Sequence, residues 1–294
     1  MSPTISRLSV GVCVISMFLV LPSLRSQAFT FGPVQTIPIA ASSTYIVTPL
    51  EMNGDGDTDL YISGGEGNFI YLGNGKGTFS SNPVEAVQAG IGSLQASPVF
   101  YDVNGDGFAD EIYAYSGFND PVGANSYNGV FAVLLGDGKG NFSASSIYSL
   151  GGDQGGGSLV AGDFNQDKKL DFALAYPGTS GEGSAIVVFL NTGNGKFLAS
   201  SPIALNGYPG GRSSLTVGDF SGDGKLDLAW ADQLPEAGTK NQFGIHCLMG
   251  NGDGTFRPDR VCYTLDGAPF ALASADFNRD GKADLVVSTY VRLN

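Results

Sequence analysis

Acidic and amide side chains recur in this chain in a nine-residue pattern that suits a hard cation. In the clearest copy, Asp219–Asp227, the first, fifth and ninth residues are aspartates, the third is Ser221 and the sixth is Gly224. Ca²⁺ takes about six to eight oxygen ligands from carboxylates, amides, backbone carbonyls and water. Alternate residues of a tight loop can point inward, and glycine permits the sharp turn. The pattern therefore predicts a cation-binding loop in which the backbone carbonyl of Lys225, the seventh residue, is a further ligand.

The pattern occurs five times, and we number the copies loop one to loop five in chain order. The predicted ligands are Glu51, Asn53, Asp55, Asp57 and Asp59 in loop one; Asp102, Asn104, Asp106, Phe108 and Asp110 in loop two; Asp163, Asn165, Asp167, Lys169 and Asp171 in loop three; Asp219, Ser221, Asp223, Lys225 and Asp227 in loop four; and Asp276, Asn278, Asp280, Lys282 and Asp284 in loop five. Up to five Ca²⁺ ions are expected. Glu51 at the first position and Lys168 at the sixth make loops one and three the poorest matches.

The loops fit calcium better than three alternatives. An EF-hand needs a glutamate at the twelfth position and flanking helices. The twelfth residues here are all apolar or aromatic: Ile62, Tyr113, Leu174, Trp230 and Val287. Transition metals prefer His and Cys ligands, whereas the only histidine, His246, alternates with apolar neighbours and is predicted to be structural. A tight turn without an ion is the remaining alternative, which the mutual repulsion of three close carboxylates disfavours.

The positioning elements are predicted to be short strands. A second signature, Asn-Gly or Asp-Gly between apolar runs, lies between the loops, as in Leu72–Phe79 and Leu135–Phe142, and is typical of β-hairpins. The fourth repeat then contains strands at 215–217, 226–231, 243–248 and 261–265. The loops begin 51 to 61 residues apart, a spacing that indicates an array or a closed ring of repeats. Four short antiparallel strands in each repeat predict an all-β fold, a β-propeller with one blade per repeat.

The repeats divide the chain into about five visible blades. We expect a signal peptide at 1–28, a propeller at 29–294, a ring-closing strand at 29–40, and blades at about 43–89, 94–150, 157–205, 213–265 and, in part, 270–294. The last blade lacks an obvious third strand. An incomplete five-bladed ring and a piece of a longer propeller are both consistent with this pattern, and the second is favoured.

The N-terminal residues predict secretion. Arg7 precedes an apolar run from Leu8 to Leu21, and the small residues Ser26 and Ala28 suit cleavage after Ala28. The run is shorter than the roughly 20 residues of a membrane span, so a cleaved signal is favoured over an anchor, and no span is expected afterwards. An extracellular or periplasmic location follows.

Two cysteines remain after signal cleavage, and an oxidising compartment makes their pairing plausible. Cys247 and Cys262 flank one hairpin turn, which would place them on paired strands. Cross-strand disulfide geometry is demanding, so two free thiols are an equal alternative.

Composition limits the partners. Gly contributes 44 of the 294 residues and charged residues only 15%, which suits short strands and tight turns. The net charge is −13, and a nucleic-acid partner is not expected because the chain has no basic surplus. Three carboxylates in each loop account for more than half of the 28 acidic residues, so the acidity is mainly a property of the loops.

At the residues of the five acidic loops the chain resembles the FG-GAP (VCBS-type) repeat family, whose best-known members are the propellers of integrin α-subunits. The resemblance covers roughly 29–294, and its clearest segments are Gly218–Leu228, Asp102–Asp110 and Ala275–Leu285. It implies calcium in the loops between the first and second strands, on one face of the propeller, and partner-binding loops on the opposite face. Integrin function itself is not carried over.

We therefore expect a secreted, monomeric, non-enzymatic binding or adhesion module with structural calcium. Its ligand would be an extracellular protein or glycan, contacted through 117–128, 177–184, 206–213 and 232–241. The alternatives are a lectin-like or carbohydrate-active propeller, including a polysaccharide-active enzyme, and a non-catalytic part of a larger surface protein. Carboxylate-pair hydrolysis would have to use the few acids outside the loops, such as Glu85, Glu111, Asp120, Glu182 and Glu236. The aromatic residues that follow the loops are predicted to be core and not sugar platforms: Trp230, Tyr61, Tyr113, Tyr115 and Tyr176.

Overall fold

The structure is a computed structural model, and every regular element in its described part is a β-strand. It describes residues 44–64, 67–81, 83–89, 98–116, 128–153, 158–176, 185–205, 214–234, 242–258 and 260–290, all within one compact unit, Ile37–Asn294. The predicted signal peptide and the expected strand at 29–40 lie outside these ranges. So do the candidate contact regions, apart from Asn128 and residues 232–234. Among the residues covered, no helix is long and apolar enough to cross a membrane.

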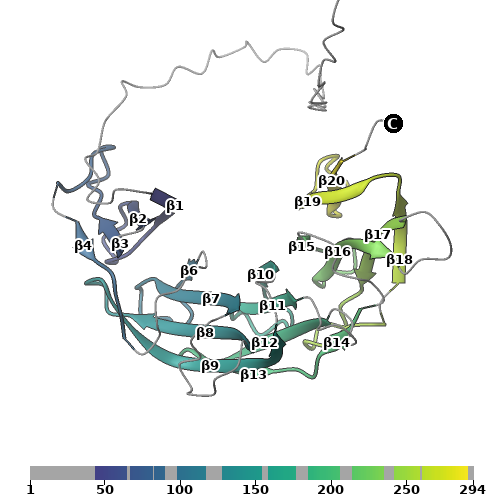
Figure 1. Cartoon of the computed structure of the whole chain (residues 1–294), viewed down its shortest axis with the longest axis horizontal. Coiled ribbons are helices and arrows are strands. Elements are labelled where there is room, and N and C mark those ends of the chain that lie inside the picture. The colour runs from purple at the N-terminus through teal and green to yellow at the C-terminus, as the bar shows by residue number, and fades with distance from the viewer. Residues whose placement is uncertain are drawn as a thin grey trace, which may run out of the picture. The chain divides into compact units, whose positions relative to one another are not determined.

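The strands are labelled β1 to β20 in Figure 1. Their bounds are β1 Thr44–Leu50, β2 Asp59–Gly64, β3 Gly67–Tyr71, β4 Val84–Glu85, β5 Val87–Ala89, β6 Val99–Tyr101, β7 Asp110–Ser116, β8 Asn128–Gly136, β9 Asn141–Asp153, β10 Ser158–Gly162, β11 Asp171–Tyr176, β12 Ala185–Gly193, β13 Lys196–Ala199, β14 Ile203–Ala204, β15 Ser214–Gly218, β16 Asp227–Leu234, β17 Gln242–Leu248, β18 Arg260–Leu265, β19 Ala268–Ala275 and β20 Asp284–Tyr290.

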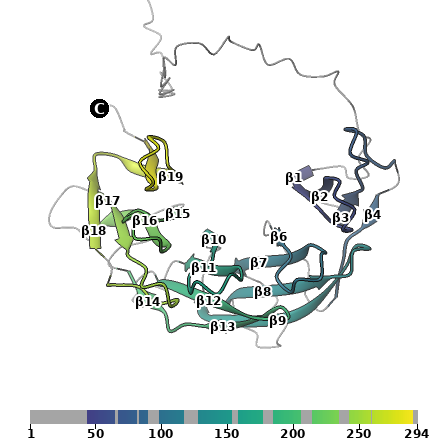
Figure 2. The ribbon, with the colours of Figure 1, turned by 180° about the vertical axis from the view of Figure 1, so that it is seen from behind.

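These strands form five sheets that follow one another along the chain. The strand orders are β1-β2-β3-β4, β5-β9-β8-β7-β6, β10-β11-β12-β13 with β14 also on β12, β15-β16-β17-β18, and β19-β20. Consecutive sheets lie side by side in both Figure 1 and Figure 2. Within each sheet, consecutive strands pair antiparallel, so the fold is the predicted all-β propeller of antiparallel blades.

One strand departs from the simple repeat. β5 lies inside the expected first blade, about 43–89, yet it pairs in parallel with β9 of the second sheet. Pro83, which cannot donate a backbone hydrogen bond, directly precedes β4, and β4 is only two residues long. The chain therefore leaves the first sheet early and adds an outer strand to the second sheet.

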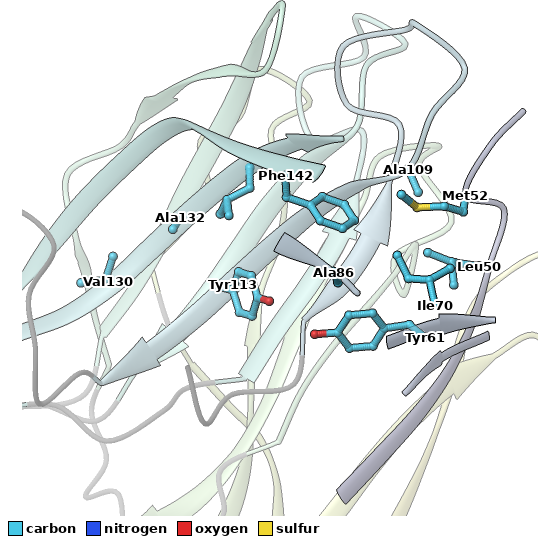
Figure 3. Close-up of a cluster of buried hydrophobic side chains, with 11 residues drawn as sticks. Leu50, Met52, Tyr61, Ile70, Ala86, Ala109, Tyr113, Val130, Ala132 and Phe142 are labelled. Atoms are coloured by element: carbon cyan, nitrogen blue, oxygen red, sulfur yellow. The ribbon is translucent and has the colours of Figure 1, made fainter. Parts of the chain in front are cut away.

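The core lies between consecutive sheets. Each of four apolar clusters draws its residues from two neighbouring sheets, and β11 is buried along its whole length because sheets cover both of its faces. Figure 3 shows the cluster between the first two sheets, in which the side chains of Tyr61 and Tyr113 extend toward each other. The Tyr61 ring also lies 4.8 Å from that of Phe100.

Four of the five aromatic residues that follow the loops are core, as predicted, and the side chain of the fifth, Tyr115, lies outside the described part. Trp230, Tyr61 and Tyr113 are fully buried, and Tyr176 is nearly so. Burial, followed by the charge of Glu111 and the neighbouring Tyr61, raises the pKa of Tyr113, so its hydroxyl stays protonated at neutral pH. These side chains are therefore unavailable as exposed platforms for sugars.

The stacked pair Phe131 and Phe189 provides a test of core packing between sheets. The two rings are 3.9 Å apart, and Phe131 is fully buried. Phe131→Ala should lower the free energy of unfolding by about 3–5 kcal/mol because it leaves a cavity between the second and third sheets. Leu198→Ala, at a side chain that is 63% exposed, is the control and should change it by less than about 0.5 kcal/mol. Chemical denaturation measures both variants, and similar losses would contradict this placement of the core.

Candidate cation-binding loops

The five loops occupy the same place in each sheet. The first residue of each loop directly follows an initial strand (β1, β6, β10, β15 or β19), and the ninth residue begins the next strand (β2, β7, β11, β16 or β20). Each predicted set of ligands is thus brought together locally between two paired strands. The ligands of different loops belong to different sheets.

In loops one to four the ninth-position aspartate is the most deeply buried residue of the loop. Asp110 is fully buried, and its carboxylate accepts the backbone N–H of Val103 and of Gly136, each at 2.9 Å. Asp59, Asp171 and Asp227 are also fully buried and accept the equivalent pair of N–H groups. Asp284, in the two-stranded sheet, accepts N–H groups from its own loop, those of Phe277 and Asn278. This aspartate therefore ties the loop to its sheet.

The hairpin residue that donates to this aspartate was not predicted from the sequence. In three sheets it is a glycine: Gly73, Gly136 or Gly250. A Cβ atom on Gly136 would lie 2.1 Å from the carbonyl oxygen of Ala109, so no larger residue fits without a shift of the backbone. The glycine after the apolar run in the Leu-Gly-Asn-Gly and Leu-Gly-Asp-Gly signatures is the signal that could have revealed this contact.

Burial and neighbouring carboxylates both perturb the ninth aspartate. Burial raises the pKa of Asp110 to about 6, and the charges of Asp106 and Asp102 add to the rise, while the two N–H groups oppose it. The pKa values of Asp59 and Asp171 are also raised, first by burial and then by the acids of their own loops. In loops one, two and three the acids at the first and fifth positions thus disfavour the charged form of the ninth aspartate.

The first-position aspartate organises the turn. Asp219 accepts the N–H groups of Gly222 at 2.6 Å, Gly224 at 2.8 Å and Asp223 at 3.1 Å. Slight burial acts to raise the pKa of Asp219, but these bonds hold it below its usual range. Asp102, Asp163 and Asp276 accept N–H groups of their loops in the same way.

The third and fifth side chains touch each other. Asn104 accepts the N–H of Asp106 at 2.9 Å, and its amide group donates to the Asp106 carboxylate at 2.9 Å. Asp106 in turn accepts the N–H of Phe108, the seventh residue. The same contacts recur in loops one and five.

Loop three keeps this shape although a lysine replaces its glycine. The fourth and sixth residues of all five loops have positive φ, and in loop three these are Gln166 at 62° and Lys168 at 67°. A side chain in this region costs roughly 1 kcal/mol. Loop three also contains its own counter-ion, because the Lys169 ammonium lies 2.7 Å from the Asp167 carboxylate and lowers its pKa.

Loop one differs at its first residue. Glu51 accepts the N–H groups of Asn53 and Gly54. Within the described residues it does not accept the N–H of the sixth residue, as the first-position aspartates of loops two, four and five do. Its second carboxylate oxygen, Oε2, is buried without a hydrogen-bond partner. A buried acceptor in this position calls for a donor or a cation.

The donors fit an oxygen-preferring cation in kind. Carboxylates, amide oxygens and backbone carbonyls gather in each loop, the acids repel one another, and Glu51 has an orphaned buried oxygen. The carboxylates at the first and ninth positions nevertheless turn toward backbone N–H groups. In the described ranges no three His, Cys, Asp or Glu side chains form a ready-made metal cluster. When bound, Ca²⁺ would supply a positive charge to these oxygens, and the loop residues would hold it.

The cysteine pair lies away from the loops. A disulfide joins Cys247 on β17 to Cys262 on β18, with their Cα atoms 5.9 Å apart. It fastens the outermost strand of the fourth sheet. His246, next to Cys247, is fully buried in β17.

The fold and the loops define a β-propeller built from repeats that each contain one acidic loop. Residues 52–113, 116–174, 163–230 and 237–287 match the FG-GAP-like repeat. These matches cover most of the chain, and the chain belongs to the FG-GAP-like repeat family.

Other comparisons add little. No protein with a curated description matches the sequence. Among solved structures, the chain is similar to a lectin from Agrocybe aegerita described as specifically recognising non-reducing terminal N-acetylglucosamine. The identity is 18%, the TM-score is 0.43, and the match covers 84% of this chain and 75% of the lectin. A likeness at this level carries no argument about what this chain binds.

Asp110 allows the structural role of the ninth position to be tested separately from cation binding. Asp110→Ala should lower the free energy of unfolding by about 2 kcal/mol or more, because it leaves two buried N–H groups without an acceptor. Asp106→Ala removes an equal charge from an exposed position and is the control. Both are measured in excess chelator, so that no cation contributes. Equal losses for the two variants would show that Asp110 has no special structural role.

Proposed function

We propose that this chain is a secreted, non-catalytic β-propeller that binds an extracellular partner and is stabilised by calcium in its acidic loops. The observation that carries the calcium proposal is the recurrence of one local arrangement in all five loops, each at the junction between the strand at one edge of its sheet and the neighbouring strand. Family membership supports the propeller scaffold. The predicted signal at 1–28 supports secretion.

Calcium has a physical role in this arrangement. In loops one, two and three the acids at the first and fifth positions raise the pKa of the ninth aspartate, which is buried in every loop except loop five. A cation among their oxygens would offset that repulsion and favour the closed loop. Because each loop joins two paired strands, a cation that holds the loop together would also stabilise the pairing of those two strands. This role is structural and requires no exchange of ligand during function.

The binding surface is proposed from chain position. The segments that differ most between repeats join the second and third strands of a sheet, as at 117–127, 177–184 and 235–241. In a propeller these connections lie at the opposite end of the second strand from the acidic loop. The proposed partner is an extracellular protein or glycan, contacted there and at 206–213.

A non-catalytic role is favoured by the acids that lie outside the loops. Glu111, one of the few candidates for hydrolysis, is fully buried on β7 beside the core tyrosine Tyr113. A polysaccharide could not reach it without unfolding of the sheet. Glu85 is exposed on β4, and the other candidates lie outside the described residues.

Removing calcium should destabilise the protein. The melting temperature of the purified chain is expected to fall by several degrees in excess chelator and to recover when Ca²⁺ is restored. Mg²⁺ at the same concentration should restore less, because it demands a smaller octahedral cage. A melting curve unaffected by chelator and by added Ca²⁺ would contradict the proposal.

Catalysis can be tested independently of metal content. Incubation with a panel of extracellular polysaccharides should release no reducing ends, whether or not a glycan is retained. The same panel, immobilised as an array, reports binding. Reducing sugar that is also released by heat-denatured protein would indicate contamination. Release that requires the folded chain would overturn the non-catalytic role.

A further inference from the structure

Loop four is held by the loops on both sides of it in sequence. Gln166, the fourth residue of loop three, donates from Nε2 to the carbonyl oxygen of Gly224 at 3.1 Å. The N–H of Ala283 in loop five donates to the carbonyl oxygen of Asp219 at 2.9 Å. These bonds join elements of three different sheets.

Gln166 is an unusual residue for its position. Loops one, two and four have glycine there, whereas Gln166 adopts a φ of 62° at a cost that glycine would avoid. Strained residues persist where the surrounding structure requires them. Here the side chain makes the contact to loop four that glycine could not make.

The Gln166 contact reaches a predicted cation ligand. The carbonyl of Gly224 and the N–H of Lys225 belong to one planar peptide unit. That N–H donates to the carboxylate of Asp223 at 3.1 Å. By fixing the carbonyl end of the peptide, Gln166 orients the N–H that holds Asp223, the fifth-position ligand of loop four.

Gln166 is also close in sequence to the predicted cation ligands of its own loop, loop three. Gln166 stands between Asn165 and Asp167, which are predicted ligands at the third and fifth positions. The Asp167 carboxylate accepts the N–H of Lys169, and the N–H of Asp167 donates to the side-chain oxygen of Asn165, so the residues on both sides of Gln166 are already hydrogen-bonded. A cation that immobilises Asn165 and Asp167 would also immobilise the backbone that carries the Gln166 side chain.

We propose that loops three and four bind cations with positive cooperativity and that Gln166 is the positioning residue that transmits it. This inference rests on the proposed calcium function and adds its regulation. A cation bound in loop three would fix Gln166 where it orders Asp223, which raises the cation affinity of loop four. Thermodynamic linkage requires that a cation bound in loop four raises the affinity of loop three by the same factor. One hydrogen bond of ordinary strength corresponds to a change in affinity of about two- to tenfold.

The test is a thermodynamic cycle on the full chain, with terbium as an oxygen-preferring probe. Trp230, the only tryptophan, lies in β16 three residues after Asp227 and can sensitise terbium luminescence. The part of the signal that Asp223→Asn removes is assigned to loop four. Loop three is disabled by combining Asp163→Asn with Asp167→Asn. The affinity of loop four is then measured with loop three intact or disabled, each with and without Gln166→Gly.

Gln166→Gly removes the side chain but keeps a residue that accepts positive φ, so the loop backbone is preserved. Disabling loop three should weaken loop four about two- to tenfold when Gln166 is present and leave it unchanged when Gln166→Gly is present. Arg279→Gly is the matched control, because Arg279 is the fourth residue of loop five with a φ of 65°. It should leave the effect of loop three on loop four intact.

The outcomes separate this inference from the function on which it rests. An equal weakening of loop four with and without Gln166→Gly would overturn the role of Gln166. If Gln166 had a purely structural role, Gln166→Gly would lower the melting temperature but would not change the factor by which disabling loop three weakens loop four. If the unmodified chain shows no saturable terbium or calcium binding at loop four, the calcium proposal itself fails.

Discussion

The buried aspartate at the ninth position of loops one to four is the interaction on which the rest of those repeats depends. Its carboxylate accepts one N–H from the start of its own loop and another from the hairpin between the third and fourth strands, as Asp110 does from Val103 and Gly136. One side chain thus joins the loop, the second strand and the outer hairpin. A buried carboxylate is unfavourable unless its oxygens are satisfied, so this arrangement allows little variation in either partner.

The crowding of acids in the loops follows from that constraint. Once the ninth aspartate is fixed in the interior, the turn brings the carboxylates at positions one and five close to it, and they repel it. Backbone N–H groups offset part of this charge, and the proposed cation would offset the remainder. Loop three also contacts loop four through the hydrogen bond from Gln166 to the carbonyl of Gly224, so neighbouring loops are directly connected.

The repeat, its strands and its fold class could be predicted because they rest on local spacing. Asx-Gly turns, alternating apolar residues and the period of the loops are all visible in the sequence, and the core position of Trp230 and Tyr61 follows from them. Contacts across long separations could not be predicted. The parallel pairing of β5 with β9, the bond from Gln166 to loop four and the burial of Glu111 depend on how sheets pack. The ninth aspartate was predicted as a ligand, but its bond to the hairpin requires knowing that a distant glycine lies against the loop.

The central claim is that the five acidic loops hold calcium in the folded protein. It is tested most directly by the metal content of the chain, purified without chelator and exchanged into metal-free buffer, measured by elemental analysis against protein concentration. We predict several calcium ions per chain, up to five, and their loss when the loop carboxylates at the fifth position are replaced by asparagine. A folded chain that contains no calcium, and takes up none when it is supplied, would contradict the account.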